Sequence, residues 1–87
     1  MDKFQGAVIK EQGVTFAIVV VKPSVLQVRS TSENFAGSMS RYFPGLPIIL
    51  MAQDSRGRAS YWGRTDIVNF LSHISISRIP WKEYTVQ

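Results

Sequence analysis

Apolar residues are arranged along the chain as short β-type runs and two stripes with helical spacing. The runs 4–10 and 14–22 flank Glu11-Gln12-Gly13, which predicts a hairpin with a positive φ at Gly13. Residues 14–22 are apolar at both alternating sets of positions, so both faces of this strand should be covered. The pattern predicts a central strand that ends at Pro23, because proline donates no hydrogen bond to a sheet.

A first helix is predicted beyond this strand. Residues 23–29 fit either a connecting loop or an early helical turn. Ser30 and Glu33 fit a capping box, in which the Ser30 hydroxyl accepts from the Glu33 amide and the Glu33 carboxylate accepts from the Ser30 amide. Apolar residues then recur along one helix face at Phe35, Ala36, Met39, Tyr42 and Phe43. Pro44-Gly45 should end the helix.

The second half of the chain has the same order of elements. Residues 47–53 predict a second central strand, and Asp54-Ser55-Arg56-Gly57 suits a type I turn followed by a left-handed residue. Residues 58–63 should return as its partner strand. Thr65 is the expected N-cap of a last helix, with Asp66 in the first turn. The buried stripe of that helix is Ile67, Phe70, Leu71 and Ile74.

These elements predict an α+β (mixed α/β) domain over 1–87. The order β-β-α-β-β-α indicates one four- to five-stranded mixed sheet with two helices. Residues 75–87 form a C-terminal tail, which should pack back on the domain, as a short strand, through Trp81, Tyr84 and Val86. If the 24–46 connection joins the two central strands in parallel, the crossover should be right-handed.

Composition narrows the classes of function. With 87 residues, 45% of them hydrophobic and 18% charged, the chain has material for one modest core. It has no cysteine, which excludes disulfides, thiolate catalysis and cysteine-bound zinc and favours a reducing compartment. The longest unbroken apolar run, 16–21, is too short to span a bilayer, and the first residues show no signal-peptide pattern. We therefore expect a protein of a bacterial-type cytoplasm with no membrane contact.

The net charge of +4 is spread evenly, since residues 1–43 and 44–87 each carry five basic and three acidic side chains. The strongest candidate binding residues are the arginines and aromatic residues of the second hairpin: Arg56, Arg58, Tyr61, Trp62 and Arg64. Guanidinium groups fit phosphate or carboxylate, and aromatic faces stack on bases. The pattern also fits an exposed hairpin with solubilising arginines, and we favour this interpretation because Asp54 and Asp66 flank the arginines.

Strand alternation separates the two aromatic residues of this hairpin. Arg58, Ser60 and Trp62 should share one face, and Ala59, Tyr61 and Gly63 the other. We therefore expect only one of Tyr61 and Trp62 to face solvent beside Arg58, while the other belongs to the core. The remaining aromatic residues, Phe4, Tyr42, Trp81 and Tyr84, should mainly pack the core; an aromatic patch for a partner or a homodimer is the alternative.

No catalytic, metal or cofactor motif is present. His73, the sole histidine, is expected near the C-terminus of the last helix, where it interacts with the final carbonyls. No pair of potential ligands has metal-binding spacing, and no phosphate-binding glycine loop or nucleophile elbow occurs. We expect a protein that is not an enzyme and has no metal and no cofactor.

Residues 44–74 resemble the C-terminal β-hairpin and helix of thioredoxin-like domains. The matching features are Pro47 before a strand, the 54–57 turn, Tyr61, Gly63 and Phe70-Leu71. The resemblance implies a cis peptide bond at Pro47 and a preceding strand and helix that supply the other half of the fold. The redox cysteines of that family are missing, so the implied role is a scaffold reused for binding.

The sequence thus predicts a small non-enzymatic binding or assembly module. Its expected partner is another protein or a second copy of the chain. The alternative is weak nucleic-acid or anionic-ligand binding through the 56–64 hairpin.

Overall fold

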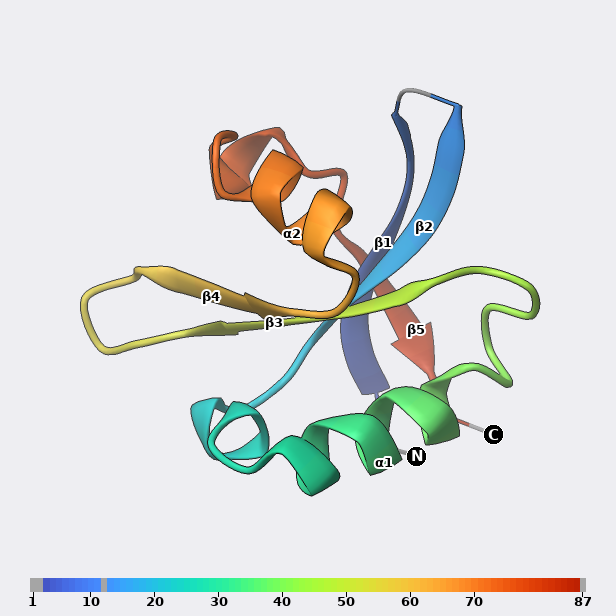
Figure 1. The fold of residues 1–87 in the computed structure, drawn as a ribbon, viewed down its shortest axis with the longest axis horizontal. Coiled ribbons are helices and arrows are strands. Elements are labelled where there is room, and N and C mark those ends of the chain that lie inside the picture. The colour runs from blue at the N-terminus through green and yellow to red at the C-terminus, as the bar shows by residue number, and fades with distance from the viewer. Residues whose placement is uncertain (1–2, 12, 87) are drawn as a thin grey trace.

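A five-stranded mixed sheet with the order β4-β3-β2-β1-β5 forms the centre of the computed structural model, which describes residues 3–11 and 13–86 (Figure 1). Its strands are β1 (Lys3–Glu11), β2 (Val14–Val20), β3 (Ile48–Gln53), β4 (Ala59–Trp62) and β5 (Lys82–Thr85). Only β2 and β3 are parallel to each other; the other neighbours are antiparallel. The predicted α+β class is confirmed, and the C-terminal tail provides the fifth strand.

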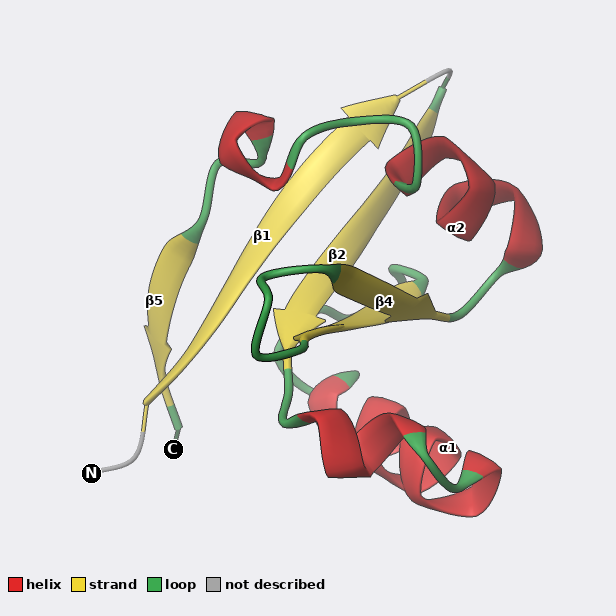
Figure 2. Ribbon diagram, turned by 90° about the vertical axis from the view of Figure 1, so that its left-hand side faces the viewer, coloured by secondary structure: helices red, strands yellow, loops and turns green. Residues whose placement is uncertain are grey.

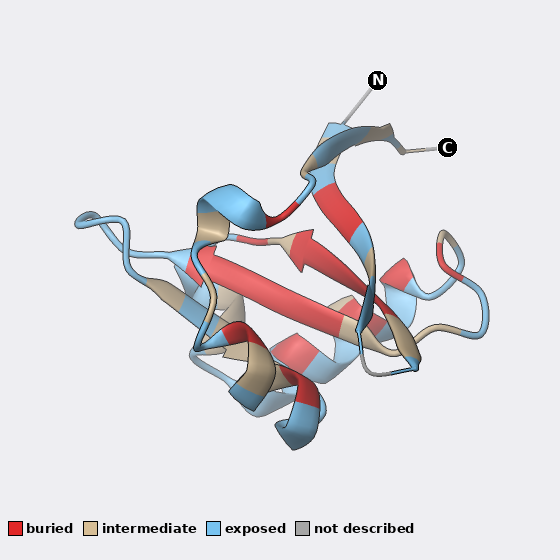
Figure 3. Ribbon diagram, turned by 90° about the horizontal axis from the view of Figure 1, so that it is seen from above, coloured by how far each residue is buried: buried red, intermediate tan, exposed pale blue. Residues whose placement is uncertain are grey.

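Helical elements cover both faces of the sheet (Figure 1). The 3-10 helix η1 (Pro23–Leu26) and α1 (Arg29–Met39) lie on one side, and α2 (Thr65–Leu71) and the 3-10 helix η2 (Ile76–Arg78) lie on the other. Phe16 and Ile18 of β2 face the core under α2, whereas Ala17 and Val19 face the core under α1. Double coverage explains why β2 is apolar at every position from Phe16 to Val20, and Figure 3 shows this burial along the central strands.

The turns follow the predicted chemistry. Gly13 has a φ of 79°, although Gln12 of the predicted first turn lies outside the described residues. In the second hairpin, Gly57 has a φ of 81° and the Asp54 carboxylate accepts hydrogen bonds from the Arg56 and Arg58 amides, both at 2.9 Å. Left-handed glycines and an aspartate that binds the backbone explain why these turns were predictable.

The predicted capping box at Ser30 and Glu33 is wrong. The helix α1 begins at Arg29, its N-cap is Val28, and no side chain caps it. Glu33 instead accepts a hydrogen bond from Arg29 Nε at 3.0 Å, and the fully buried Ser32 donates from Oγ to the Val25 carbonyl at 2.9 Å. Burying Ser32 ties η1 to α1, and this tertiary contact shifts the start of the helix.

Three further expectations fail at the ends of elements. The first helix ends at Met39 rather than at Pro44, so Tyr42 and Phe43 lie in the following turns, where Phe43 packs against Tyr84. Thr65 is the first residue of α2 and not its N-cap, and no side chain caps that helix. The described residues contain no cis peptide bond, so the cis Pro47 implied by the thioredoxin-like resemblance is wrong.

Candidate binding site at the β4 edge

The outer edge of β4 is open, and no ribbon passes alongside it (Figure 2). The Asp54 amide donates to the Arg58 carbonyl at 2.9 Å, which makes Asp54 and Arg58 a hydrogen-bonded pair. In an antiparallel pair of strands every second residue bonds to the partner strand, so the pattern of β4 can be counted from Arg58. Ser60 and Trp62 therefore bond to β3, while the amide and carbonyl groups of Ala59 and Tyr61 point outward. These outward groups are free to pair with an added strand.

The open edge lacks the usual protection against strand pairing. Proteins often blunt an edge strand with proline or with charged side chains. The opposite edge strand, β5, carries Lys82 and Glu83, whereas β4 consists of Ala-Ser-Tyr-Trp. Charges occur only beyond the ends of β4, at Arg58 and Arg64. The sheet is therefore open to pairing mainly at β4.

Cavities lie along both faces of β4. On the α1 face, a cavity of about 910 Å³ is lined in part by Trp62, Gly63 and Arg64, and a second of about 370 Å³ includes Ser60 and Trp62. On the α2 face, a cavity of about 300 Å³ is lined in part by Ala59, Tyr61 and Leu71. An extended segment on this edge would thus have room for side chains on either face.

Tyr61 and Trp62 lie on opposite faces of the sheet, as strand alternation predicted. Tyr61 packs against the core under α2, and Trp62 packs against the core under α1. The expectation that one of them would face solvent while the other belongs to the core is wrong, because both are half-buried and each packs against a core. Helices cover both faces of the sheet, so the side of each ring that faces the sheet centre packs against a core. The other side of each ring is open toward the β4 edge.

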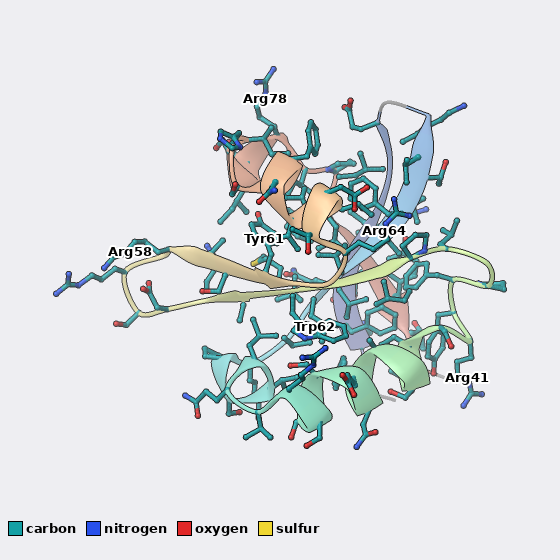
Figure 4. The ribbon with its side chains drawn as sticks, in the orientation of Figure 1. Arg41, Arg58, Tyr61, Trp62, Arg64 and Arg78 are labelled. Atoms are coloured by element: carbon teal, nitrogen blue, oxygen red, sulfur yellow. The ribbon has the colours of Figure 1, made fainter. Side chains whose placement is uncertain are left out.

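The structure separates the candidate arginines into two places. Arg56 and Arg58 lie at the hairpin turn, where Arg58 Nε is 3.7 Å from Asp54 Oδ2. Arg64 lies beyond the other end of β4, where the chain turns toward α2, and Figure 4 shows it far from Arg58. The hairpin therefore presents no single cluster of arginines.

Arg29 joins Arg64 and Trp62 in the lining of the large cavity. Sequence reasoning missed Arg29, because its only local signal is the spacing to Glu33, which indicates an ordinary helix-surface ion pair. The parallel β2–β3 crossover brings the start of α1 beside the end of β4, and no local pattern encodes that juxtaposition.

Arg64 and Asp66 form a close ion pair where the chain passes from β4 into α2. Arg64 donates from Nε to Asp66 Oδ1 at 3.1 Å and from Nη2 to Oδ2 at 2.6 Å. These hydrogen bonds lower the pKa of the Asp66 carboxyl and raise the pKa of Arg64. The ionised pair therefore holds the Arg64 guanidinium in one orientation.

We predict that Asp66→Asn changes the pH dependence of stability. Because folding lowers the pKa of Asp66 below its ordinary value of 3.8, the ionised carboxylate stabilises the folded state at pH values above 3.8. This stabilisation is lost as the pH falls through the lowered pKa of the folded state. The Tm of the wild type should exceed that of Asp66→Asn at pH 6, and the gap should close toward pH 2. A Tm difference that stays constant over this range would contradict the prediction.

The Tyr61 hydroxyl is buried, and it has no hydrogen-bond partner within 3–11 and 13–86. Its burial raises the pKa of the phenol. We predict that Tyr61→Phe increases the free energy of unfolding by about 1 kcal/mol, because it removes an unsatisfied polar group and keeps the ring. Urea denaturation measures this change. Tyr61→Leu, which also removes the ring, should be less stable than Tyr61→Phe; a loss of stability in Tyr61→Phe would refute the prediction.

His73 lies at the C-terminal end of α2, as predicted, with Nδ1 2.7 Å from the Asn69 carbonyl oxygen. Among the described residues, no group of three or more His, Asp or Glu side chains is placed to hold a metal ion. No helix in the same residues is long and apolar enough to cross a membrane. Comparisons with protein-family models, curated proteins and solved structures give no match.

Proposed function

We propose that this chain is a non-enzymatic binding module that takes up an extended segment of a partner protein as an additional strand on β4. The observation that supports this function is the open edge of β4, with outward backbone groups at Ala59 and Tyr61 and cavities on both faces. In strand addition, backbone hydrogen bonds provide affinity and pockets for alternate side chains provide specificity. The absence of cysteine supports action in a reducing compartment such as the bacterial cytoplasm.

Charge at the ends of β4 favours a different protein over a second copy of this chain. Two antiparallel copies of β4 would place Arg64 of one copy opposite Arg56 or Arg58 of the other, depending on register. Like charges directly opposite each other destabilise a strand pair, and a two-fold dimer would contain two such contacts. A partner segment with acidic or neutral residues at these positions avoids this repulsion.

The test uses a phage-displayed library of random linear dodecapeptides, selected on the immobilised full chain. The Kd of a selected peptide is then measured for the wild type, Ala59→Pro and Ala59→Ser. Proline removes an outward amide without removing a bond to β3, and serine keeps that amide. We expect Ala59→Pro to weaken binding at least about tenfold and Ala59→Ser to change it less than about twofold.

Hydrogen exchange on the wild-type chain provides a readout that does not depend on the folding of a variant. The selected peptide should slow exchange of the Ala59 and Tyr61 amides and leave the β5 amides unchanged. Protection at β5 instead of β4, or equal binding to Ala59→Pro and wild type, would overturn the proposal. A dimer in light scattering that Ala59→Pro dissociates would replace the partner protein with a second copy.

A further inference from the structure

The two faces of the sheet beside the open edge of β4 differ in chemistry. The cavity of about 300 Å³ on the α2 face is lined mainly by apolar or aromatic side chains, namely Ala59, Tyr61, Leu71, Ile74 and Ile76. Its other lining residues, Arg58 and Ser72, are exposed. The cavity of about 370 Å³ on the α1 face mixes apolar residues with the polar residues Gln27, Asp54 and Ser60. A strand added to β4 would therefore meet an apolar surface on one face and a mixed surface on the other.

The part of the α2-face cavity that lies beyond β4 is held in place by contacts with the core. Leu71 is fully buried, and the half-buried Ile74 and Ile76 pack against the same core as Tyr61. The Trp81 indole donates from Nε1 to the Ile76 carbonyl at 3.2 Å, which ties η2 to the segment before β5. The apolar surface is therefore formed before a partner binds, so little ordering of the cavity opposes binding.

Strand geometry decides which residues of an added segment face this cavity. Ala59 and Tyr61 direct their backbone groups outward, and their side chains pack on the α2 face, as Figure 4 shows for Tyr61. Residues directly opposite each other on paired strands have their side chains on the same face, and successive residues alternate between the faces. The two residues of the segment opposite Ala59 and Tyr61 therefore place their side chains on the α2 face. The residue between them, opposite the exposed Ser60, faces the α1 side.

We infer that the partner segment is an amphipathic strand, with apolar side chains at the two positions opposite Ala59 and Tyr61 and a polar residue between them. This inference rests on the proposed strand addition and names the class of segment that β4 accepts. An apolar side chain beside Leu71, Ile74 and Ile76 leaves water, which favours binding. A polar side chain at the same place would lose its hydration without a buried partner, so the cavity selects against it.

A peptide segment fits this edge better than a small apolar molecule. Small-molecule sites have volumes of roughly 300–1,000 Å³ and enclose most of the ligand. The α2-face cavity is at the small end of this range, and exposed and half-buried residues form most of its lining. A small molecule would therefore stay partly in water, whereas a segment is also held by backbone hydrogen bonds to Ala59 and Tyr61.

The first experiment uses a dodecapeptide selected on the wild-type chain as described above. Each residue of the peptide is replaced in turn by serine, and the Kd for the wild-type chain is measured. We expect two positions, separated by one residue, at which serine weakens binding by at least about tenfold. Serine at the position between them should change the Kd less than about threefold.

Two variants of the chain test where the apolar side chains bind. Ile76→Ala removes part of the cavity lining. The matched control is Ile9→Ala, because Ile9 is also half-buried against the core under α2 but lies on β1, with β2 and β3 between it and β4. We expect Ile76→Ala to weaken the selected peptide about three- to tenfold and Ile9→Ala to change its Kd less than about twofold. At least one of the two sensitive serine peptides should bind Ile76→Ala and the wild type within about twofold, because its contact with Ile76 is already lost.

Nuclear magnetic resonance on the wild-type complex gives a readout that does not depend on the folding of a variant. Nuclear Overhauser effects should connect the two apolar side chains of the peptide to Ile74 and Ile76 on the α2 face. They should be absent between these side chains and Trp62, which packs on the opposite face of the sheet.

The outcomes separate this inference from the proposed function. Selected peptides without apolar residues two positions apart, apolar side chains in contact with Trp62, or equal effects of Ile76→Ala and Ile9→Ala would overturn the amphipathic segment. If Ala59→Pro still weakened binding about tenfold in those cases, strand addition would stand without it. Equal binding to Ala59→Pro and the wild type would overturn strand addition itself, and with it the register inferred for the segment.

Discussion

Replacement of Gly63 by alanine is expected to lower the free energy of unfolding by about 3 kcal/mol. Gly63 has a φ of 149°, which side-chain-bearing residues rarely adopt. A Cβ at this position would also collide with Ile49 Cδ1 and lie 3.2 Å from the Ile48 carbonyl oxygen. Backbone strain and steric overlap therefore act together where β4 leaves the sheet to begin α2.

Gly37→Ala is the matched control for this prediction. Gly37 lies in α1, where an added Cβ meets no atom within 4 Å, so alanine should stabilise the helix by up to about 1 kcal/mol. Urea denaturation followed by circular dichroism measures both variants. A Gly63→Ala protein as stable as the wild type would show that the close contact between Gly63 and β3 is not a constraint on the fold.

Replacement of Phe16 by alanine is expected to lower the free energy of unfolding by about 4 kcal/mol. Phe16 is 1% exposed and belongs to the core that includes Ile67 and Leu71 of α2. A chain of 87 residues has a total stability of roughly 4–13 kcal/mol, so this loss would take a large part of it. The variant should show a much lower urea midpoint and a lower Tm.

Two controls accompany the Phe16 variant. Phe16→Leu keeps most of the buried volume and should lose only about 1 kcal/mol. Val8→Ala, on the neighbouring strand β1, removes methyl groups from a side chain that is 42% exposed and should have little effect. Equal losses for Phe16→Ala and Val8→Ala would contradict the assignment of Phe16 to the core.

The proposed function connects these stability predictions to the site. Gly63 allows the chain to turn sharply beside β3, and this turn brings Gly63 and Arg64 into the lining of the large cavity. Phe16 supports α2, which forms one wall of the smaller cavity on the Tyr61 face. Residues that hold the sheet and its helices together therefore also shape the open edge of β4.

Local patterns in the sequence were sufficient to predict the strands and the turns. Continuous apolar residues in β2 require cover on both faces, and the Asp54–Gly57 turn depends only on residues within four positions of each other. The helix stripe of Ile67 and Leu71 was predictable for the same reason, because each helix must bury one face. These features follow from interactions between residues that are close in the sequence.

Tertiary contacts decided the helix starts and the composition of the candidate site. Ser30 and Glu33 fitted a capping box in the sequence, but α1 begins at Arg29, and the neighbouring Ser32 is buried with its hydroxyl donating to the Val25 carbonyl. Arg29, Trp62 and Arg64 contribute to the lining of one cavity because β2 and β3 are parallel and the crossover returns α1 to the β4 edge. The sequence by itself therefore determined which elements form, since alternation and turn chemistry are local. Only the tertiary structure decided which side chains lie together and that β4 is left open, since both depend on the order of the strands in the sheet.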